Sequence, residues 1–272
     1  MAPEEKTGKK REGKEMPFLE HLEELRGVLL QSFVVVGALA LVAWFVAPGA
    51  VDVMTAPAGR LVFLGPAEAF TLRLKVSLFL GFLVALPFVL FKVWSFVAPG
   101  LFEKEKKALG LVVVGSTVLF IAGALFGFFV LVPFAFRFLL GFATDNLQPM
   151  ISAGNYFGFV TKLVIAFGVV FQLPLVVSML TYAGLVKADW LLRNWKLALV
   201  VIAICSAFLT PPDVASQMMM GIPVTALYFL SAGLSILIER RKRREKEAAE
   251  EEEGEEDEEE VEEPPGGEEE EG

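Results

Sequence analysis

A short charged turn between two long apolar runs is the first place in this sequence where side chains could bind a ligand. Residues 94–107 read WSFVAPGLFEKEKK, so that Glu103 and Glu105 stand among three lysines shortly after Pro99 and Gly100. Proline disfavours helix at the preceding residue and glycine adopts left-handed backbone, so this pair predicts a turn. Such a charged turn is one of the places where the protein could recognise a partner. The alternative is that the two glutamates only balance the neighbouring lysines.

The patterns that catalytic and metal sites require are missing. The sequence holds no nucleophile motif, no glycine-rich phosphate loop and no pair of carboxylates within an apolar run. His21 is the single histidine, which excludes a histidine-cluster metal site, and Cys205 is the single cysteine, which excludes an intramolecular disulfide. We therefore predict that the protein is not an enzyme and binds no metal or cofactor.

Two other polar residues lie within or beside apolar runs. Gln172 is near the middle of such a run, and an amide buried in hydrocarbon without a partner is costly. We expect it to face the interior of a helix bundle or a wet cavity; the alternative is an interhelical hydrogen bond worth about 0.6 kcal/mol. Pro174 predicts a bend close by. Asp213 lies at the end of a run, where capping of the next helix is the simplest role.

The apolar runs that carry these residues are long enough to cross a membrane. Of the 272 residues 55% are hydrophobic, and the mean hydropathy is +0.59. About 20 apolar residues in a helix span the hydrocarbon core of a bilayer. The sequence predicts an all-α polytopic membrane protein. Its membrane domain is residues 16–238, with six transmembrane helices at about residues 27–47, 76–97, 108–136, 163–186, 195–209 and 214–238.

The segments outside the spans are polar. Residues 1–15 predict a disordered leader. Residues 18–26 have apolar side chains at helical spacing, which predicts an amphipathic helix at the membrane surface; the alternative is an ordinary juxtamembrane helix whose charges are only solvated. Residues 48–73 and 137–154 are predicted to be loops. Residues 239–272 comprise a basic stop segment and a tail predicted to be disordered, because the last 28 residues hold 18 acidic residues and one lysine.

Basic residues are distributed unevenly between the two sides of the predicted bundle. The N-terminal segment, the turn at 98–107, the loop at 187–196 and the segment after Ile238 together hold 18 Lys and Arg, whereas the opposite side holds five. Positively charged loops favour the cytoplasmic side, so both termini are predicted to be cytoplasmic. The basic stretch 240–244 could also bind anionic lipid.

Five segments, in order along the chain, resemble the TatC family, the multispan receptors of the twin-arginine protein translocase. Residues 18–26 resemble the family's N-terminal signature, and residues 96–105 resemble its first cytoplasmic loop. Residues 65–70 resemble the element before its second span, and residues 167–174 resemble its fourth span. Residues 210–217 resemble its last outside turn. Together the five cover the chain from residue 17 to about residue 238.

This resemblance implies a cup-like six-helix fold without enzymatic activity. It also implies a site for signal peptides that carry two adjacent arginines, on proteins exported already folded. The residues that match the family's signal-binding positions are Glu24, Arg26, Phe96 and Glu105. Those that match its docking edge for single-span TatA or TatB partners are Thr210 and Gln217. Other motif positions are Glu68, Pro99 and Asp213.

One residue departs from the family pattern. Many members carry Glu where this chain has Gln172, and Gln cannot ionise, so only a hydrogen-bonding role carries over. The resemblance further implies a plasma (inner) membrane protein that contacts lipid, associates with further copies of itself and binds no nucleic acid. The alternative function is a small-solute secondary transporter. Such transporters have a substrate site at the middle of the membrane, broken helices in corresponding positions of two halves and usually a carboxylate for ion coupling. In this sequence only Gln172 and Pro174 resemble these features.

Overall fold

The computed structural model describes residues 12–55, 58–59, 61–97, 106–144, 150–210 and 213–262. Regular structure in these ranges is mainly helical, and Val62 and Ser152 form an isolated β-bridge. The elements are α1 (Glu12–Thr55), α2 (Glu68–Val97), α3 (Lys106–Phe126), a π-helical segment (Gly127–Leu131), α4 (Val132–Leu140), α5 (Ala153–Val170), α6 (Leu173–Tyr182), α7 (Ala188–Arg193), α8 (Trp195–Leu209) and α9 (Val214–Glu262).

Six helical segments of the described chain are apolar enough for a membrane. Five are also long enough to cross it, and α8 is a shorter apolar helix of 15 residues. Large apolar side chains cover much of the outside of the bundle; Phe45, for example, is 80% exposed. Such a surface suits lipid and not water. The fold class predicted from the sequence, an all-α membrane protein built from six apolar helices, is confirmed.

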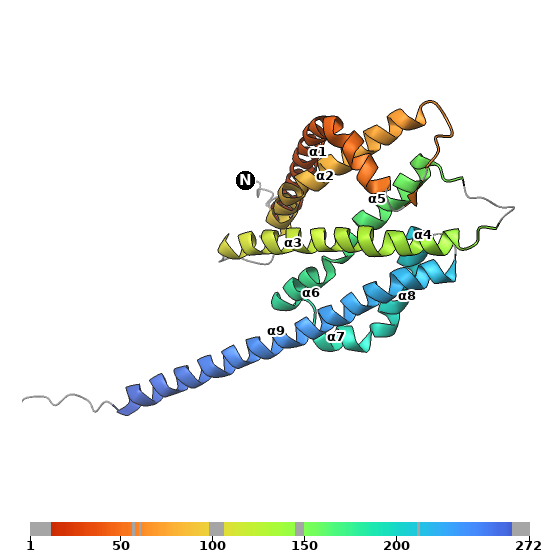
Figure 1. Ribbon diagram of the computed structural model, residues 1–272. Helices are drawn as coiled ribbons and strands as arrows, with labels where there is room; N and C mark the ends of the chain where they lie inside the picture. The colour runs from red at the N-terminus through yellow and green to blue at the C-terminus, as the bar shows by residue number, and fades with distance from the viewer. Residues whose placement is uncertain are drawn as a thin grey trace, which may run out of the picture.

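The other helices pack on both sides of α3 and α4, which together cross the middle of the bundle (Figure 1). In Figure 1, α3 and α4 run end to end through the π-helical segment, with α1 and α2 on one side and α6 to α9 on the other. Helix α5 supplies much of the buried core, including Tyr156, Phe157 and Phe167, which are at most 2% exposed. The core therefore lies where α5 meets α2, α3 and α4.

Helices α1 and α2 approach each other closely. A Cβ added to Gly81 of α2 would lie 2.5 Å from the backbone nitrogen of Ala40 in α1. Small residues allow helices to approach in this way in a membrane, where packing is a main driving force for association. Further along, the Arg73 guanidinium donates two hydrogen bonds to the Trp44 carbonyl, at 3.0 and 3.3 Å, and lies 4.5 Å from the centre of the Trp44 ring.

Several helices are longer than the sequence predicts. The segment 18–26 is not a separate surface helix but belongs to the first turns of α1, which begins at Glu12. Residues 48–55, predicted to be loop, are the last turns of the same helix. Helix α4 ends at Leu140, and α5 begins at Ala153, well before the predicted start of span four. The prediction followed apolar residues, whereas a helix extends into polar sequence as long as its backbone hydrogen bonds are made.

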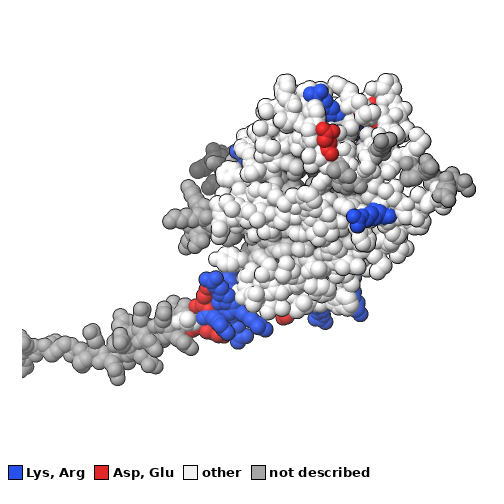
Figure 2. Space-filling model, viewed as in Figure 1, with Lys and Arg blue, Asp and Glu red and all other residues white. Residues whose placement is uncertain are grey.

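The structure has helix in the acidic tail as far as Glu262, where the sequence predicts disorder. Glutamate has a high helix propensity, and a helix that continues from a formed span needs no new nucleus. Arg241 and Arg243 pair with Glu245 and Glu247 one turn later, each at 2.8 Å. Figure 2 shows Lys and Arg gathered where α9 leaves the bundle, beside a largely uncharged face. Residues 1–11 and 263–272 lie outside the described residues.

Candidate functional site

A small cluster joins the start of α1 to the end of α2. The His21 imidazole stacks on the Phe96 ring, with the ring centres 4.0 Å apart and the planes inclined by 10°. Nδ1 of His21 lies 3.6 Å from Oε2 of Glu24, one turn along α1. That separation is too long for a hydrogen bond. We refer to His21, Glu24 and Phe96 as the aromatic–carboxylate cluster.

The carboxylate of this cluster is open to a ligand. The side chains of His21 and Glu24 are 54% and 50% exposed. Within the described residues the Glu24 carboxylate has no charged or hydrogen-bonding contact except the one with His21. A free carboxylate can accept two parallel N–H groups from one guanidinium, a geometry that the ammonium of lysine cannot reproduce. The cluster can therefore bind a cationic peptide, and arginine fits it best.

The structure brings together two of the four residues predicted for signal-peptide binding. Glu24 and Phe96 meet through His21, whereas Arg26 is exposed on α1 and makes no polar contact with another described residue. Glu105 and Pro99 lie outside the described residues. His21 was missed as a site residue. Its spacing of three from Glu24 could have indicated it, because residues three apart share a helix face.

At the opposite end of the bundle, Glu68 joins two loops. Its Oε1 accepts hydrogen bonds from the Ser152 hydroxyl and, at 2.8 Å, from the Gly154 amide. Its Oε2 accepts one from the Leu64 amide. Ser152 is in turn the N-cap of α5 and accepts the Asn155 amide at 3.4 Å. A carboxylate has about four acceptor positions, so most of the hydrogen-bonding capacity of Glu68 is already used.

Backbone and side-chain contacts complete this end. Val62 and the start of α5 exchange two backbone hydrogen bonds of 3.0 Å, one to the Ile151 carbonyl and one from the Ala153 amide. The buried Tyr156 hydroxyl donates to the Met54 carbonyl at 2.8 Å. We refer to the described residues within 54–72 and 151–156 as the stapled end. Its polar groups bind one another, and they leave little to recognise a ligand.

Gln172 lies at an interruption of the fourth apolar run. Helix α5 ends at Val170 and α6 begins at Leu173 with Pro174 in its first turn, as the proline predicts. Nε2 of Gln172 donates to the Ser116 carbonyl of α3 at 2.9 Å. Its Oε1 is buried and has no hydrogen-bond partner in the described part of the chain. The amide thus makes the interhelical hydrogen bond that the sequence left open as the alternative to a wet cavity.

Three further predicted residues lie in or close to the turn between α8 and α9. Oδ1 of Asp213 accepts the Ser216 amide at 2.6 Å, which is the capping role expected of it. The Thr210 hydroxyl donates within its own helix, to the Ser206 carbonyl at 2.9 Å. Gln217 reaches across instead, and its Nε2 donates to the Ala203 carbonyl of α8 at 2.9 Å.

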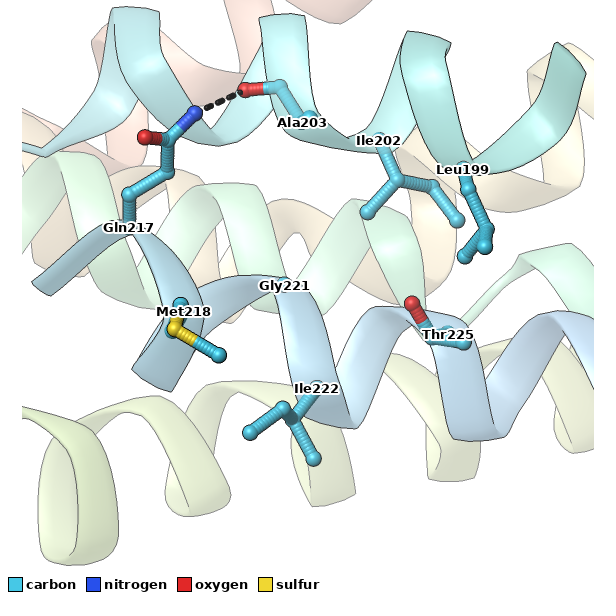
Figure 3. Close-up of a pocket in the computed structure, with 8 residues that line it drawn as sticks. All are labelled: Leu199, Ile202, Ala203, Gln217, Met218, Gly221, Ile222 and Thr225. Carbon is cyan, nitrogen blue, oxygen red and sulfur yellow. Dashed lines mark hydrogen bonds between the residues drawn. The ribbon is translucent and has the colours of Figure 1, made fainter. Parts of the chain in front are cut away.

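A groove of about 410 Å³ runs between α8 and α9. Figure 3 shows Gln217 near one end of the groove and Thr225 near the other, with mostly apolar side chains between them. Its lining is Leu199, Ile202, Ala203, Gln217, Met218, Gly221, Ile222 and Thr225. An apolar groove with one amide at its edge can receive a helix from the membrane.

Comparison with known proteins gives consistent matches over most of the chain. The family model of the Sec-independent protein translocase protein (TatC) matches residues 20–223. A protein of Desulforapulum autotrophicum named Sec-independent protein translocase protein TatC is 41% identical over 228 residues, which cover 81% of this chain and 84% of the relative. A protein of Carboxydothermus hydrogenoformans with the same name is 39% identical over 225 residues, covering 81% and 93%.

A solved structure matches the fold as well as the sequence. A crystal structure of the twin arginine translocase receptor TatC has a TM-score of 0.74 and 35% sequence identity to this chain. The match covers 80% of this chain and 99% of that one.

Proposed function

This chain belongs to the TatC family and is a component of a twin-arginine translocase, and from this premise we propose that it is the receptor for signal peptides that carry two adjacent arginines. The observation that carries the proposal is the open carboxylate of Glu24, half exposed and without a hydrogen bond in the described residues. The role is recognition and assembly, and not catalysis: the receptor binds the signal while the attached protein is exported folded.

Glu105 is the second carboxylate of the proposed site. It directly precedes Lys106, where α3 begins, and follows α2, whose end carries Phe96. A carboxylate at the start of a helix is favoured by the helix dipole. One exposed ion pair contributes only about 0.2–1 kcal/mol, so a single carboxylate cannot select a signal. Two carboxylates for two arginines, with apolar contacts from the rest of the signal, supply the selectivity.

Site-specific crosslinking of a twin-arginine signal peptide to membranes tests this proposal. Glu24→Ala and Glu105→Ala each weaken crosslinking by less than about tenfold, because each removes one exposed ion pair. The double variant nearly abolishes it. Glu23→Ala is the matched control, since Glu23 is an exposed carboxylate on the same turn of α1. If the double variant still prefers Arg-Arg over a Lys-Lys signal as strongly as the unmodified protein, these carboxylates are not the reading site.

We further propose that the protein is a plasma-membrane protein with both termini in the cytoplasm. The support is the basic asymmetry of 18 residues to five and the exposed basic residues of α9 at 240–244. In a Cys205→Ser background, single cysteines at Ala58 and Ala249 are expected to react with impermeant reagent from opposite sides. Labelling of both from outside the cell contradicts the orientation.

The groove between α8 and α9 is the proposed docking site for single-span partners of the TatA or TatB type. It is apolar along its length, as a lipid-facing partner helix requires, and Gln217 supplies an amide near one end. Gln217 already bonds the Ala203 carbonyl, so a polar residue of the partner adds to this pair or replaces it. Lipid and further copies of the chain occupy other parts of the apolar surface in this proposal.

A further inference from the structure

We propose that the His21 imidazole is a specificity-determining part of the signal-peptide site: the guanidinium of a signal arginine stacks on this ring while Glu24 binds its N–H groups. The inference rests on the proposed receptor function. It adds one residue, besides the two carboxylates, to those that discriminate arginine from lysine.

The ring is held in position on one face and is open on the other. Phe96 lies parallel to the imidazole, with 4.0 Å between the ring centres. Because one face of the imidazole is covered and the His21 side chain is still 54% exposed, a second flat group has access to the opposite face. The pair also links α1 to α2, so the platform does not depend on the orientation of a single side chain.

The carboxylate lies at the edge of this platform. Oε2 of Glu24 is 3.6 Å from Nδ1 of His21, and the two atoms are not hydrogen-bonded. A guanidinium stacked over the imidazole therefore has its N–H groups beside a carboxylate to which no described residue donates a hydrogen bond. The imidazole of His21 provides a flat face for stacking, and the Glu24 carboxylate provides a negative charge that accepts the N–H groups.

This arrangement separates arginine from lysine on physical grounds. The guanidinium is planar and weakly hydrated, and it stacks on aromatic faces, whereas the lysine ammonium is a compact and strongly hydrated point charge. Removing the ring should weaken binding of an Arg-Arg signal roughly two- to fivefold, the size of one exposed cation–π contact. Binding of a Lys-Lys signal should weaken less, because a strongly hydrated ammonium gains less from a flat aromatic face than a guanidinium does.

Three substitutions of His21 distinguish a platform from ordinary packing. His21→Phe keeps a ring and removes both nitrogens, His21→Leu keeps apolar volume without a ring, and His21→Gln keeps a polar group near Glu24 without a ring. The measurement is the affinity of the full-length protein in lipid nanodiscs for Arg-Arg and Lys-Lys signal peptides. We expect His21→Phe to retain the Arg-Arg preference, and His21→Leu and His21→Gln each to lose roughly two- to fivefold of it.

Each alternative outcome overturns the inference. If the Leu and Gln variants keep the full preference, the ring does not read arginine. If His21→Phe loses as much as His21→Leu, a flat ring is not the feature that matters. Failure of the platform is distinct from failure of the receptor proposal, because Glu24 and Glu105 are intact in all three variants. Loss of binding in the Glu24→Ala, Glu105→Ala protein would still support the receptor.

Discussion

Glu68 and Glu24 lie at opposite ends of the bundle and differ in how their carboxylates are used. Glu68 accepts hydrogen bonds from Ser152, Gly154 and Leu64, and so it ties the loop before α2 to the start of α5. Glu24 accepts none from a described residue and is half exposed. Both stand in segments that resemble motifs of one family. A motif match alone therefore does not distinguish a residue that stabilises the fold from one that binds a ligand.

The same distinction extends to the surroundings of each glutamate. At the stapled end, Tyr156 and Val62 also bond to groups far away in the sequence. In the aromatic–carboxylate cluster, as far as the described residues show, the cross-helix contact is a ring stack, and it leaves the carboxylate free. Polar groups that hydrogen-bond to one another stabilise the protein. A carboxylate without a hydrogen bond to the described residues is available to bind a ligand.

The strongest test of this comparison is to remove each carboxylate in turn. Glu68→Ala leaves the donors at Ser152, Gly154 and Leu64 without their acceptor, so we expect the largest fall in thermal midpoint for this variant. Glu24→Ala is the matched control and should shift the midpoint by less than about 2 °C, as surface substitutions do. Thermal unfolding of the detergent-purified protein measures both.

The reverse pattern is expected for signal binding. Glu24→Ala should weaken crosslinking to a twin-arginine signal, whereas the folded fraction of Glu68→Ala should still crosslink. Equal losses of stability in the two variants would remove the distinction between the two ends.

A smaller effect is expected at the groove between α8 and α9. The double substitution Thr210→Val, Gln217→Leu removes two polar side chains, and such contacts in membranes average about 0.6 kcal/mol each. Docking of a single-span partner should weaken by less than about tenfold and should not be abolished. Crosslinking from α8 to the partner measures the change. Thr225→Val, near the other end of the groove, is the control; unchanged crosslinks in the double variant would exclude this contact.

A small effect on stability is expected at Gln172, whose Nε2 has a hydrogen-bond partner among the described residues and whose Oε1 has none. Gln172→Leu removes the hydrogen bond to the Ser116 carbonyl and should cost about 0.6 kcal/mol. We also predict reduced export by the inserted and folded Leu variant. Gln172→Glu should be tolerated better, because a protonated carboxyl can still donate to that carbonyl. Export assays beside thermal unfolding measure both, and full export by the Leu variant would show that Gln172 only packs.

Much of the fold could be predicted from the sequence because membrane insertion depends on local properties. The ends of α8 at Trp195 and Leu209 and the end of α2 at Val97 agree with the predicted spans, since apolar length and nearby breakers determine them. The ends of α1, the start of α5 and the end of α9 differ from those of the predicted spans. Polar residues can continue a helix, and the tail after residue 245 continues α9 because its glutamates favour helix and its nucleus already exists.

The membrane class and the six apolar helices follow from the sequence, as do the absence of a recognisable catalytic motif and the carboxylates in two family-like motifs. Three contacts depend on how the helices pack: the start of α5 donates to Glu68, Gln172 donates to α3, and His21 of α1 stacks on Phe96 of α2. The physical reason is that hydropathy and helix propensity act within a few residues along the chain. Hydrogen bonds and ring stacks between helices depend on how distant segments pack, and no local pattern specifies that.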